Sequence, residues 1–276
     1  MAETMEFLPR SEVLTIEELL RTARLFTELG VRKIRVTGGE PLIRRGVHEL
    51  FEGLGALAGL DSLALTTNGS QLADSGHALR DAGVNSINIS LDSLQAERFK
   101  AITRIGDLNT VLRGIDSAVD CDFDRIRLNA VILDGLNRDE VLPLTHYALE
   151  KGIHIAFIEE MPLGQVNVGG KPLAYVSSDT LQKELAEHFT LVPTTGSDTA
   201  GPARDFLIAG SQTQVGFISP HSHNFCAQCN RLRISAEGRL LMCLGNEESI
   251  DLRGLLRPGS TDDEIKTTII ENLGIK

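Results

Sequence analysis

Five short apolar segments recur in the first part of the chain, and each one leads directly into a cluster of polar residues. The apolar segments are Lys33–Val36, Ser62–Leu65, Ser86–Ile89, Ile126–Leu128 and Ile153–Ile158. The clusters that follow them start at Thr37, Thr66, Ser90, Asn129 and Glu159. Adjacent clusters are about 24 to 39 residues apart, which leaves room for one helix in each connection. Strands that alternate with helices at this spacing predict a parallel α/β sheet, either barrel-like or doubly wound.

The connections carry the expected helix signals. Thr15 and Glu18 form a capping box ahead of an apolar stripe with a helical repeat, and Gly30 ends that stripe. A similar stripe follows Asp107. A third helix is predicted to begin with a capping box of Asn137 and Glu140.

The third helix is expected to end near Gly152, and Pro143 falls at its sixth residue, where a proline disturbs the first turn.

Beyond Pro162 the sequence changes to short strands and loops around one amphipathic helix at 178–189. We therefore predict two parts. Residues 1–162 form a barrel, and residues 163–276 form an extension laid against it.

The polar clusters all lie where strands end. In parallel α/β folds, ligands and catalytic groups gather at that edge of the sheet, so the clusters predict one shared rim. Arg35 lies two residues before Thr37 and should project near this rim. The alternative for Arg35 is an ion pair with a helix carboxylate.

Composition narrows the possible ligands and the compartment. The 276 residues include 27 Lys and Arg against 38 Asp and Glu, a net charge of −11. This excess disfavours nucleic acid and anionic membranes as partners, so a phosphate ligand must meet a few well-placed arginines. The chain has no apolar run long enough for a membrane span and no secretory signal, and four cysteines are too few for a disulfide scaffold. We expect a cytoplasmic protein.

Three of the four cysteines crowd together near the end of the chain. Cys226 and Cys229 are separated by two residues, and Cys243 follows after thirteen more. This spacing suits one metal ion or an iron–sulfur cluster, and three thiolates are one short of a closed tetrahedral zinc site. A zinc site completed by His221 or His223 and a 4Fe–4S cluster with one open iron both remain possible from the residues alone.

Two arginines follow this cysteine pair. Arg231 and Arg233 lie two residues apart and face the same side of a strand, which suits a phosphate or a guanine edge. As ordinary surface arginines they would need no ligand. Cys121 stands alone near the end of a helix and is expected to be structural.

Seven motifs occur in one order along the chain. They are KIRVTGGEPL at 33–42, LTTNG at 65–69, NISLDSL at 88–94, LNAV at 128–131, FIEEMP at 157–162, GFISP at 216–220 and CAQCNRLR at 226–233. Together they resemble the GTP 3′,8-cyclases, the radical S-adenosylmethionine (SAM) lyases that open molybdenum cofactor biosynthesis. The match runs from about Phe7 to about Arg257.

The resemblance implies a partial (β/α)6 TIM-type barrel with two 4Fe–4S clusters and a C-terminal iron–sulfur extension. In that family, a 5′-deoxyadenosyl radical derived from SAM abstracts the ribose 3′ hydrogen of GTP, and the sugar radical closes on C8 of guanine. The second cluster offers its open iron to the guanine. The implied partners are GTP, SAM, an electron donor, the downstream cyclic pyranopterin monophosphate synthase and a second copy of the chain.

Carried over by position, the resemblance implies three sets of site residues. The ligands of the second cluster would be Cys226, Cys229 and Cys243. The GTP contacts would be Arg35, Thr66, Arg231, Arg233 and Arg127, the last standing where the family usually has lysine. The SAM contacts would be Gly39, Ser90 and Met161, although a methionine is more often plain core than a ligand contact.

The first cluster of the family needs a C-x3-C-x2-C motif, and the chain has none. Its start resembles the segment just after that motif, so we expect a truncated member that lacks the first barrel strand. A C-terminal Gly-Gly tail typical of the family is also missing. We expect this chain alone to be inactive, and the alternative is a non-catalytic remnant of the same fold that binds GTP or zinc.

Overall fold

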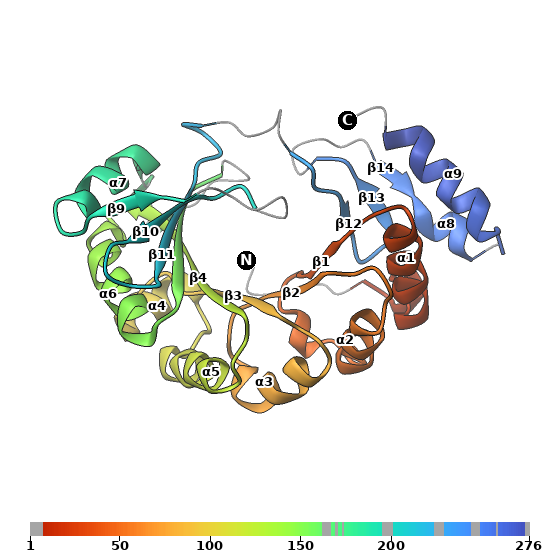
Figure 1. Cartoon of the computed structure of the whole chain (residues 1–276), viewed down its shortest axis with the longest axis horizontal. Coiled ribbons are helices and arrows are strands. Elements are labelled where there is room, and N and C mark those ends of the chain that lie inside the picture. The colour runs from red at the N-terminus through yellow and green to blue at the C-terminus, as the bar shows by residue number, and fades with distance from the viewer. Residues whose placement is uncertain are drawn as a thin grey trace.

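The computed structural model describes residues 8–161, 174–194, 201–223, 229–243, 249–257 and 259–273, together with the strand backbones at 167–168 and 171–172. At its centre six neighbouring strands pair in parallel, in an order that confirms the five predicted strands (Figure 1). They are β1 (Lys33–Val36), β2 (Ser62–Thr67), β3 (Ser86–Ser90), β4 (Arg125–Asp134), β5 (His154–Glu159) and β11 (Gln214–Ile218).

Shorter strands extend this sheet. β10 (Arg204–Ile208) and β9 (Leu191–Pro193) continue it antiparallel beyond β11, and β8 (Ala174–Tyr175) pairs with the end of β4. β6 (Asn167–Val168) and β7 (Lys171–Pro172) form a separate two-stranded ribbon.

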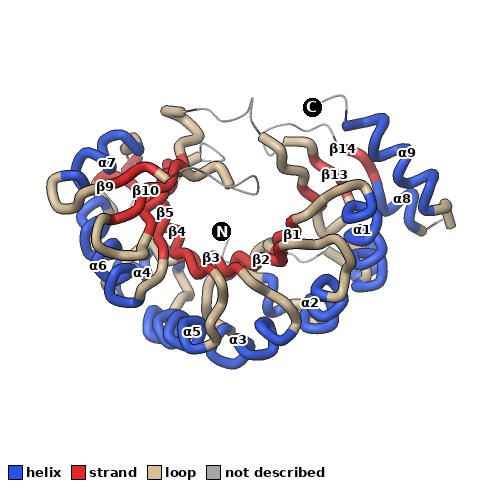
Figure 2. Tube along the Cα trace, viewed as in Figure 1, coloured by secondary structure: helices blue, strands red, loops and turns tan. Residues whose placement is uncertain are grey.

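Helices cover the outer side of the curved sheet, and the strands line its inner side (Figures 1 and 2). The helices are α1 (Ile16–Glu28), α2 (Val47–Gly55), α3 (Leu72–Asp81), α4 (Ala96–Thr103), α5 (Leu108–Asp120), α6 (Val141–Lys151) and α7 (Ser178–Ala186). Short 3-10 helices occur at Arg10–Glu12, Pro41–Ile43 and Arg138–Glu140. This arrangement is a partial TIM-type barrel. No helix in the described ranges is long and apolar enough to cross a bilayer.

Strand alternation gives the sheet two different faces. The outer face is apolar and fully buried under the helices, with Leu63, Leu65, Ile87, Ile89, Leu128, Ile155 and Phe157 at its centre. The positions between them point to the inside of the curve. That inner face is polar, and cross-strand register aligns Thr66, Asn88, Arg127, His154 and Gln214 on it.

A second core joins the C-terminal part of the chain to α1. It contains Leu25 and Phe26 of α1 together with Leu240, Leu252 and Ile265. The C-terminal elements are β12 (Arg233–Ile234), β13 (Arg239–Leu241), β14 (Ser249–Asp251), α8 (Leu252–Leu256) and α9 (Asp262–Leu273). They lie beside α1 at one end of the barrel (Figure 1). The capping box at the start of α1 is confirmed, with Glu18 N donating to Thr15 Oγ1 at 3.2 Å.

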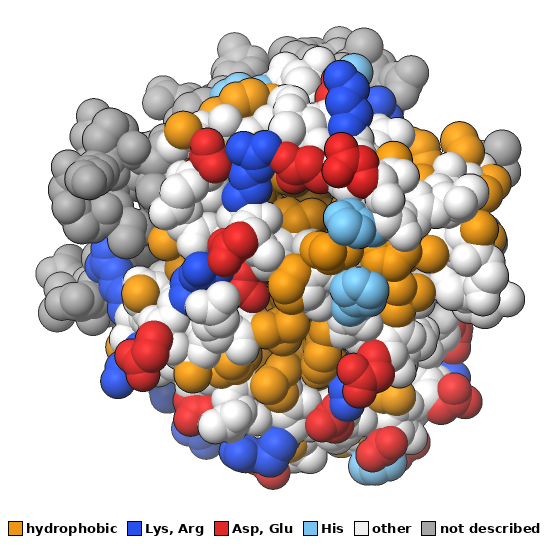
Figure 3. All heavy atoms as spheres, turned by 90° about the vertical axis from the view of Figure 1, so that its left-hand side faces the viewer, with side chains coloured by type: hydrophobic (Ala, Val, Ile, Leu, Met, Phe, Trp, Pro, Cys, Tyr) orange, Lys and Arg blue, Asp and Glu red, His pale blue; other side chains and the backbone are white. Residues whose placement is uncertain are grey.

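The opposite end of the sheet is the edge strand β9, where Val192 is 45 % exposed. Figure 3 shows apolar side chains gathered in the middle of this face of the molecule, with charged side chains around them.

The domain division at residue 162 stays a prediction, because Pro162 lies outside the described residues. The main sheet nevertheless continues past this point. β11 comes from the predicted extension and pairs in parallel with β5 of the predicted barrel.

The predicted capping box of Asn137 and Glu140 is wrong. Helix α6 begins at Val141, and Asn137 is fully buried with its side chain turned to β4. Asn137 Oδ1 accepts from Leu133 N at 2.9 Å, while Nδ2 donates to the carbonyl oxygens of Asp92 and Val131 at 2.8 and 2.9 Å.

The carboxylate of Glu140 is turned away from the helix start as well. It accepts hydrogen bonds from Ser93 Oγ and from Leu94 N, in the loop after β3. Because α6 starts at Val141, Pro143 is only its third residue and lies in the first turn, where a missing N–H costs nothing. Helix α7 also ends at Ala186, before the predicted end at Phe189.

We expect Asn137→Ala to lower the free energy of unfolding by about 3 kcal/mol, because it leaves two carbonyls and one N–H of the β3–β4 region buried without partners. Urea unfolding at constant m-value measures this loss. The control is Asn109→Ala on the exposed side of α5, which should change stability by no more than about 0.5 kcal/mol. Equal effects of the two substitutions would contradict the role given to Asn137.

Candidate active site

The inner face of the sheet carries a cluster of arginines. Arg35 lies on β1, and Arg125 and Arg127 lie on β4. Burial, together with the positive charges of Arg127 and Arg125, lowers the pKa of Arg35 to about 10. Arg35 is still a cation at neutral pH. The three guanidinium groups therefore form a positive region inside a chain of net charge −11.

Arg35 and Thr66 lie together, as predicted. Arg35 Nη1 donates to Thr66 Oγ1 and to the carbonyl oxygen of Leu65, both at 3.2 Å. In the described part of the chain these bonds, and not an ion pair with a helix carboxylate, hold Arg35. Its charge is thus available to an anionic ligand inside the barrel.

Arg127 is 7 % exposed and has a carboxylate partner that the sequence did not reveal. Asp205 on β10 accepts from Arg127 Nη2 at 2.7 Å and from Arg125 Nη2 at 3.4 Å. Asp205 lies beyond Pro162, where only short strands and loops around one helix were predicted, so no local pattern pointed to it. Lys33 and Arg125 were also missed, although their two-residue spacing from Arg35 and Arg127 places them on the same strand faces.

His154 at the start of β5 belongs to the same polar face. Its Nδ1 accepts from Gln214 N at 3.1 Å. Burial lowers the pKa of His154 to about 4, and Arg125 and Arg127 lower it too, whereas Asp205 opposes them. The imidazole is therefore neutral at pH 7, with its proton on Nε2.

The three residues predicted to contact SAM lie at the ends of three different parallel strands. Gly39 follows β1, and a Cβ built on it would meet no other atom within 4 Å, so protein packing does not demand a glycine there. Ser90 is exposed at the end of β3, and Met161, 37 % exposed, follows β5. This exposure argues against the core alternative for Met161 and fits a ligand at the rim.

Glu40 ties two of the rim loops together. Its Oε1 accepts from Thr67 Oγ1 at 2.8 Å, and its Oε2 accepts from Asn68 N at 2.6 Å. The loops after β1 and β2 are thereby held at a fixed separation, which keeps Gly39 and Thr66 in place relative to each other.

Glu159 at the end of β5 anchors the segment that leads to the cysteines. Its side chain is 1 % exposed and accepts from Ser178 N at 2.7 Å and from the N–H groups of His221 and Ser222 at 3.1 Å. Burial alone would raise the pKa of Glu159, but the hydrogen bonds from Ser222, Ser178 and His221 outweigh it and hold the pKa at about 2.

Of the three predicted cluster ligands, Cys226 lies outside the described residues. Cys229 is half-buried and Cys243 is exposed, and both are free of disulfides. In the β12–β13 hairpin Arg233 is opposite Leu241, so the chain after Leu241 returns alongside the residues that precede Arg233. The hairpin thus brings Cys243 back toward Cys229, as a shared cluster requires.

The exposed arginines Arg231 and Arg233 stand at the same hairpin. The two histidines weighed as zinc ligands have other contacts. His221 stacks edge-on against Tyr175 with ring centroids 5.2 Å apart, and His223 Nε2 lies 3.0 Å from both carboxylate oxygens of Asp179. No group of three metal-ligating side chains occurs among the described residues, which do not include Cys226.

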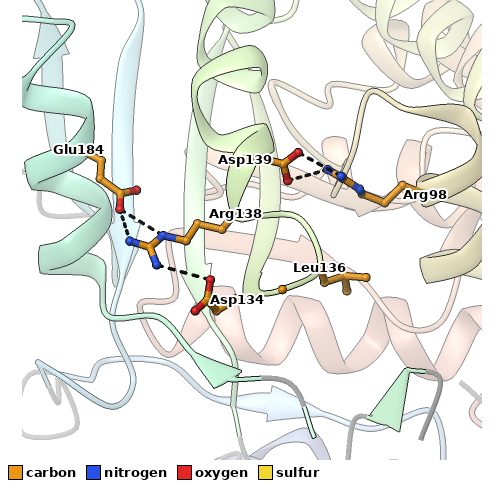
Figure 4. Close-up of a pocket in the computed structure, with 7 residues that line it drawn as sticks. Arg98, Asp134, Leu136, Arg138, Asp139 and Glu184 are labelled. Carbon is orange, nitrogen blue, oxygen red and sulfur yellow. Dashed lines mark hydrogen bonds and ion pairs between the residues drawn. The ribbon is translucent and has the colours of Figure 1, made fainter. Parts of the chain in front are cut away.

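A cavity of about 540 Å³ lies outside this region, beyond the end of β4 (Figure 4). Its charged groups pair with one another. Arg98 contacts Asp139 at 2.8 Å, and Arg138 contacts Asp134 at 3.4 Å and also Glu184. Because these charges are already matched, we assign no ligand to this cavity.

Comparison with known proteins identifies the family. Residues 2–148 match the Radical SAM superfamily, and residues 153–276 match Molybdenum Cofactor Synthesis C. The chain is 51 % identical to the GTP 3′,8-cyclase of Saccharophagus degradans, over 100 % of this chain and 83 % of that protein. The chain belongs to the GTP 3′,8-cyclase family. The GTP 3′,8-cyclase of Pseudomonas entomophila is 54 % identical to it, over 95 % of this chain and 79 % of that protein.

Membership of this family places the chain in molybdenum cofactor biosynthesis and in a superfamily that uses a 4Fe–4S cluster and SAM. Two crystal structures of SuiB from Streptococcus suis, without and with its precursor peptide SuiA, share the fold with TM-scores of 0.62. They are 14 and 13 % identical to the chain, cover 88 and 92 % of it, and are themselves covered to 58 %. The predicted partial TIM-type barrel is confirmed.

We expect the ring of His154 to titrate at about pH 4 in long-range ¹H–¹⁵N NMR spectra, and Arg127→Met to raise its pKa by removing a nearby positive charge. The pKa of His154 in the folded chain lies below the unfolded value of 6.5, so the unfolded chain takes up a proton first. The free energy of unfolding should therefore decrease as the pH falls from 6.5 toward 4. The total loss is about 2 to 3 kcal/mol. An unchanged pKa in the Arg127 variant would show that the two side chains do not face each other.

Proposed function

We propose that this chain carries the GTP site of a GTP 3′,8-cyclase, the enzyme that converts GTP into 3′,8-cyclo-7,8-dihydroguanosine 5′-triphosphate, and that the 276 residues alone do not complete the reaction because they contain no C-x3-C-x2-C motif. The observation that carries the proposal is the positive inner face of the barrel. Buried arginines cost free energy unless they have a partner of opposite charge, and a triphosphate supplies that charge.

In the proposal, Arg35 and Arg127 contact the phosphates, and the hydroxyl of Thr66 helps to hold the nucleotide. Arg231 and Arg233 approach the nucleotide from the hairpin that carries Cys229 and Cys243. Arg127 offers a planar fork where the family usually has the point charge of lysine, so it can hold a phosphate oxygen in a defined direction.

The cofactors are assigned to two places. Gly39, Ser90 and Met161 hold SAM at the rim, where their exposure leaves room for it. Cys226, Cys229 and Cys243 hold the second 4Fe–4S cluster. SAM with its reducing cluster supplies the radical that removes a hydrogen atom from the ribose. The 276 residues contain no C-x3-C-x2-C motif, so we assign none of them to the reducing cluster.

Three partners complete the proposal. In the complete enzyme an electron donor would supply the electron for the SAM cluster, and cyclic pyranopterin monophosphate synthase would take the cyclised nucleotide. A second copy of the chain forms a homodimer. Fractionation of the chain with each partner tests these associations one at a time.

We expect Arg35→Met to weaken GTP binding by about 10- to 100-fold, the usual loss for a hydrogen bond to a charged group. Isothermal titration calorimetry with the anaerobically reconstituted chain measures this change. Binding of guanosine, which has no phosphate, should be unaffected. Arg113→Met on the exposed side of α5 is the matched control and should bind GTP like the parent. Equal losses for GTP and guanosine would refute a phosphate contact.

We expect Cys229→Ser and Cys243→Ser each to lower the iron content and the brown colour of the reconstituted chain, because each removes one thiolate ligand. Iron and zinc analysis with a visible spectrum measures the effect. Cys121→Ser, in the buried end of α5, is the control and should keep the full cluster. Colourless protein that contains zinc would favour the non-catalytic zinc-binding alternative.

A further inference from the structure

The pair of Arg127 and Asp205 joins two strands that are distant in sequence. Asp205 lies on β10, opposite Gly216 of β11, and Arg127 lies on β4. Arg127 Nη2 donates to Asp205 Oδ1 at 2.7 Å, a short distance typical of a charge-assisted bond. The second oxygen, Oδ2, faces Arg125 Nη2 at 3.4 Å. One carboxylate therefore stands between two guanidinium groups.

Gly216 makes this position possible. A Cβ built on Gly216 would lie 2.4 Å from Asp205 Oδ1 and 3.4 Å from Arg127 Nη1. Any side chain at 216 would push the carboxylate off the arginine. The three residues thus form one unit in which the missing side chain of Gly216 provides the space for the ion pair.

Arg127 has one polar atom that this unit does not use. The residue is more than nine-tenths buried, and its Nε has no hydrogen-bond partner. An unpaired buried donor costs about 1 to 3 kcal/mol. Arg127 lies on the polar inner face with Arg35 and Thr66, so its guanidinium belongs to the side chains that an anionic ligand inside the barrel would meet.

The surrounding charges explain why Arg127 needs an orienting partner. The groups that face it are Lys33 and Arg35 from β1, Arg125 from β4 and His154 from β5. Arg125 lowers the pKa of Lys33 and of Arg35 and is itself affected by Arg127, so these cations repel one another. Without a carboxylate between them, Arg125 and Arg127 would move apart.

We propose that Asp205 is a positioning residue, which holds the Arg127 guanidinium so that it donates to a phosphate oxygen of the bound nucleotide. This inference rests on the proposed function and assigns one contact within it. Asp205 itself does not touch the nucleotide. It acts through Arg127 and matches one of the positive charges that the ligand would otherwise have to balance.

A double-mutant cycle tests the proposal. The dissociation constants of GTP and of inorganic tripolyphosphate are measured by calorimetry for the reconstituted parent chain, Asp205→Ala, Arg127→Met and the double variant. We expect Asp205→Ala to weaken binding by about 10-fold and Arg127→Met by at least as much. The double variant should bind within about 2-fold of Arg127→Met, because Asp205 acts on the bound nucleotide only through Arg127.

Asp61→Asn is the matched control. Asp61 forms a two-bond pair with Arg32 at 2.6 and 2.7 Å on the exposed surface, and its replacement should leave both dissociation constants unchanged. Asp205→Asn keeps the shape of the side chain and guards against unfolding. It should show a smaller loss of affinity and should lower the pKa of His154, which the charge of Asp205 raises.

The outcomes separate the inference from the proposed function. The positioning role would be overturned if Asp205→Ala weakened binding equally in the parent chain and in the Arg127→Met chain. Tighter binding by either Asp205 variant would overturn it as well. If the two substitutions are coupled in their effects on tripolyphosphate binding but the parent chain does not bind GTP, the positioning role stands and the proposed substrate is refuted. If the parent chain binds GTP but the two substitutions show no coupling, the proposed substrate stands and the positioning role is refuted.

Discussion

Strand alternation is the constraint on which the rest of this structure depends. Residues two apart on a strand face the same side, so the strands that bury leucine and isoleucine under the helices must present their other residues to the inside of the curve. Register then places Thr66, Asn88, Arg127 and His154 side by side without any help from loops. The arginine cluster of the candidate site is therefore part of the sheet itself, and the same hydrophobic packing that stabilises the barrel also fixes the spacing of these polar groups.

The electrostatics of the interior follow from this arrangement. The chain is acidic as a whole, yet its inner face collects arginines, and burial and neighbouring positive charges lower the pKa values of Arg35 and Arg125. Such a region is stabilised by any anion that enters it. Asp205 matches part of the charge permanently, and we attribute the remainder to the nucleotide. A site of this kind binds its ligand by relieving repulsion that the folded chain already contains.

Local sequence patterns predicted the elements well, because each depends on neighbouring residues. The capping box of Thr15 and Glu18 and the five strands are of this kind. Asn137 and Glu140 misled the prediction, since Glu140 accepts from Leu94 and Asn137 donates to Asp92, both in the loop after β3 and far away in sequence. Asp205 could not be found because its arginine is 78 residues away and on a non-adjacent strand. The cluster ligands stay a prediction, with Cys226 outside the described residues.

Helix α1 has apolar residues on two sides, and this has a consequence for how the molecule opens. One side packs on the barrel through Leu20 and Ala23, and the other packs on α8, α9 and the C-terminal hairpin through Leu25 and Phe26. Ion pairs of Arg24 and Arg257 with Asp262 and Glu18 tie the same elements together. The first helix and the last two thus belong to one cooperative unit, whose amide protons would become accessible to solvent in a single opening event.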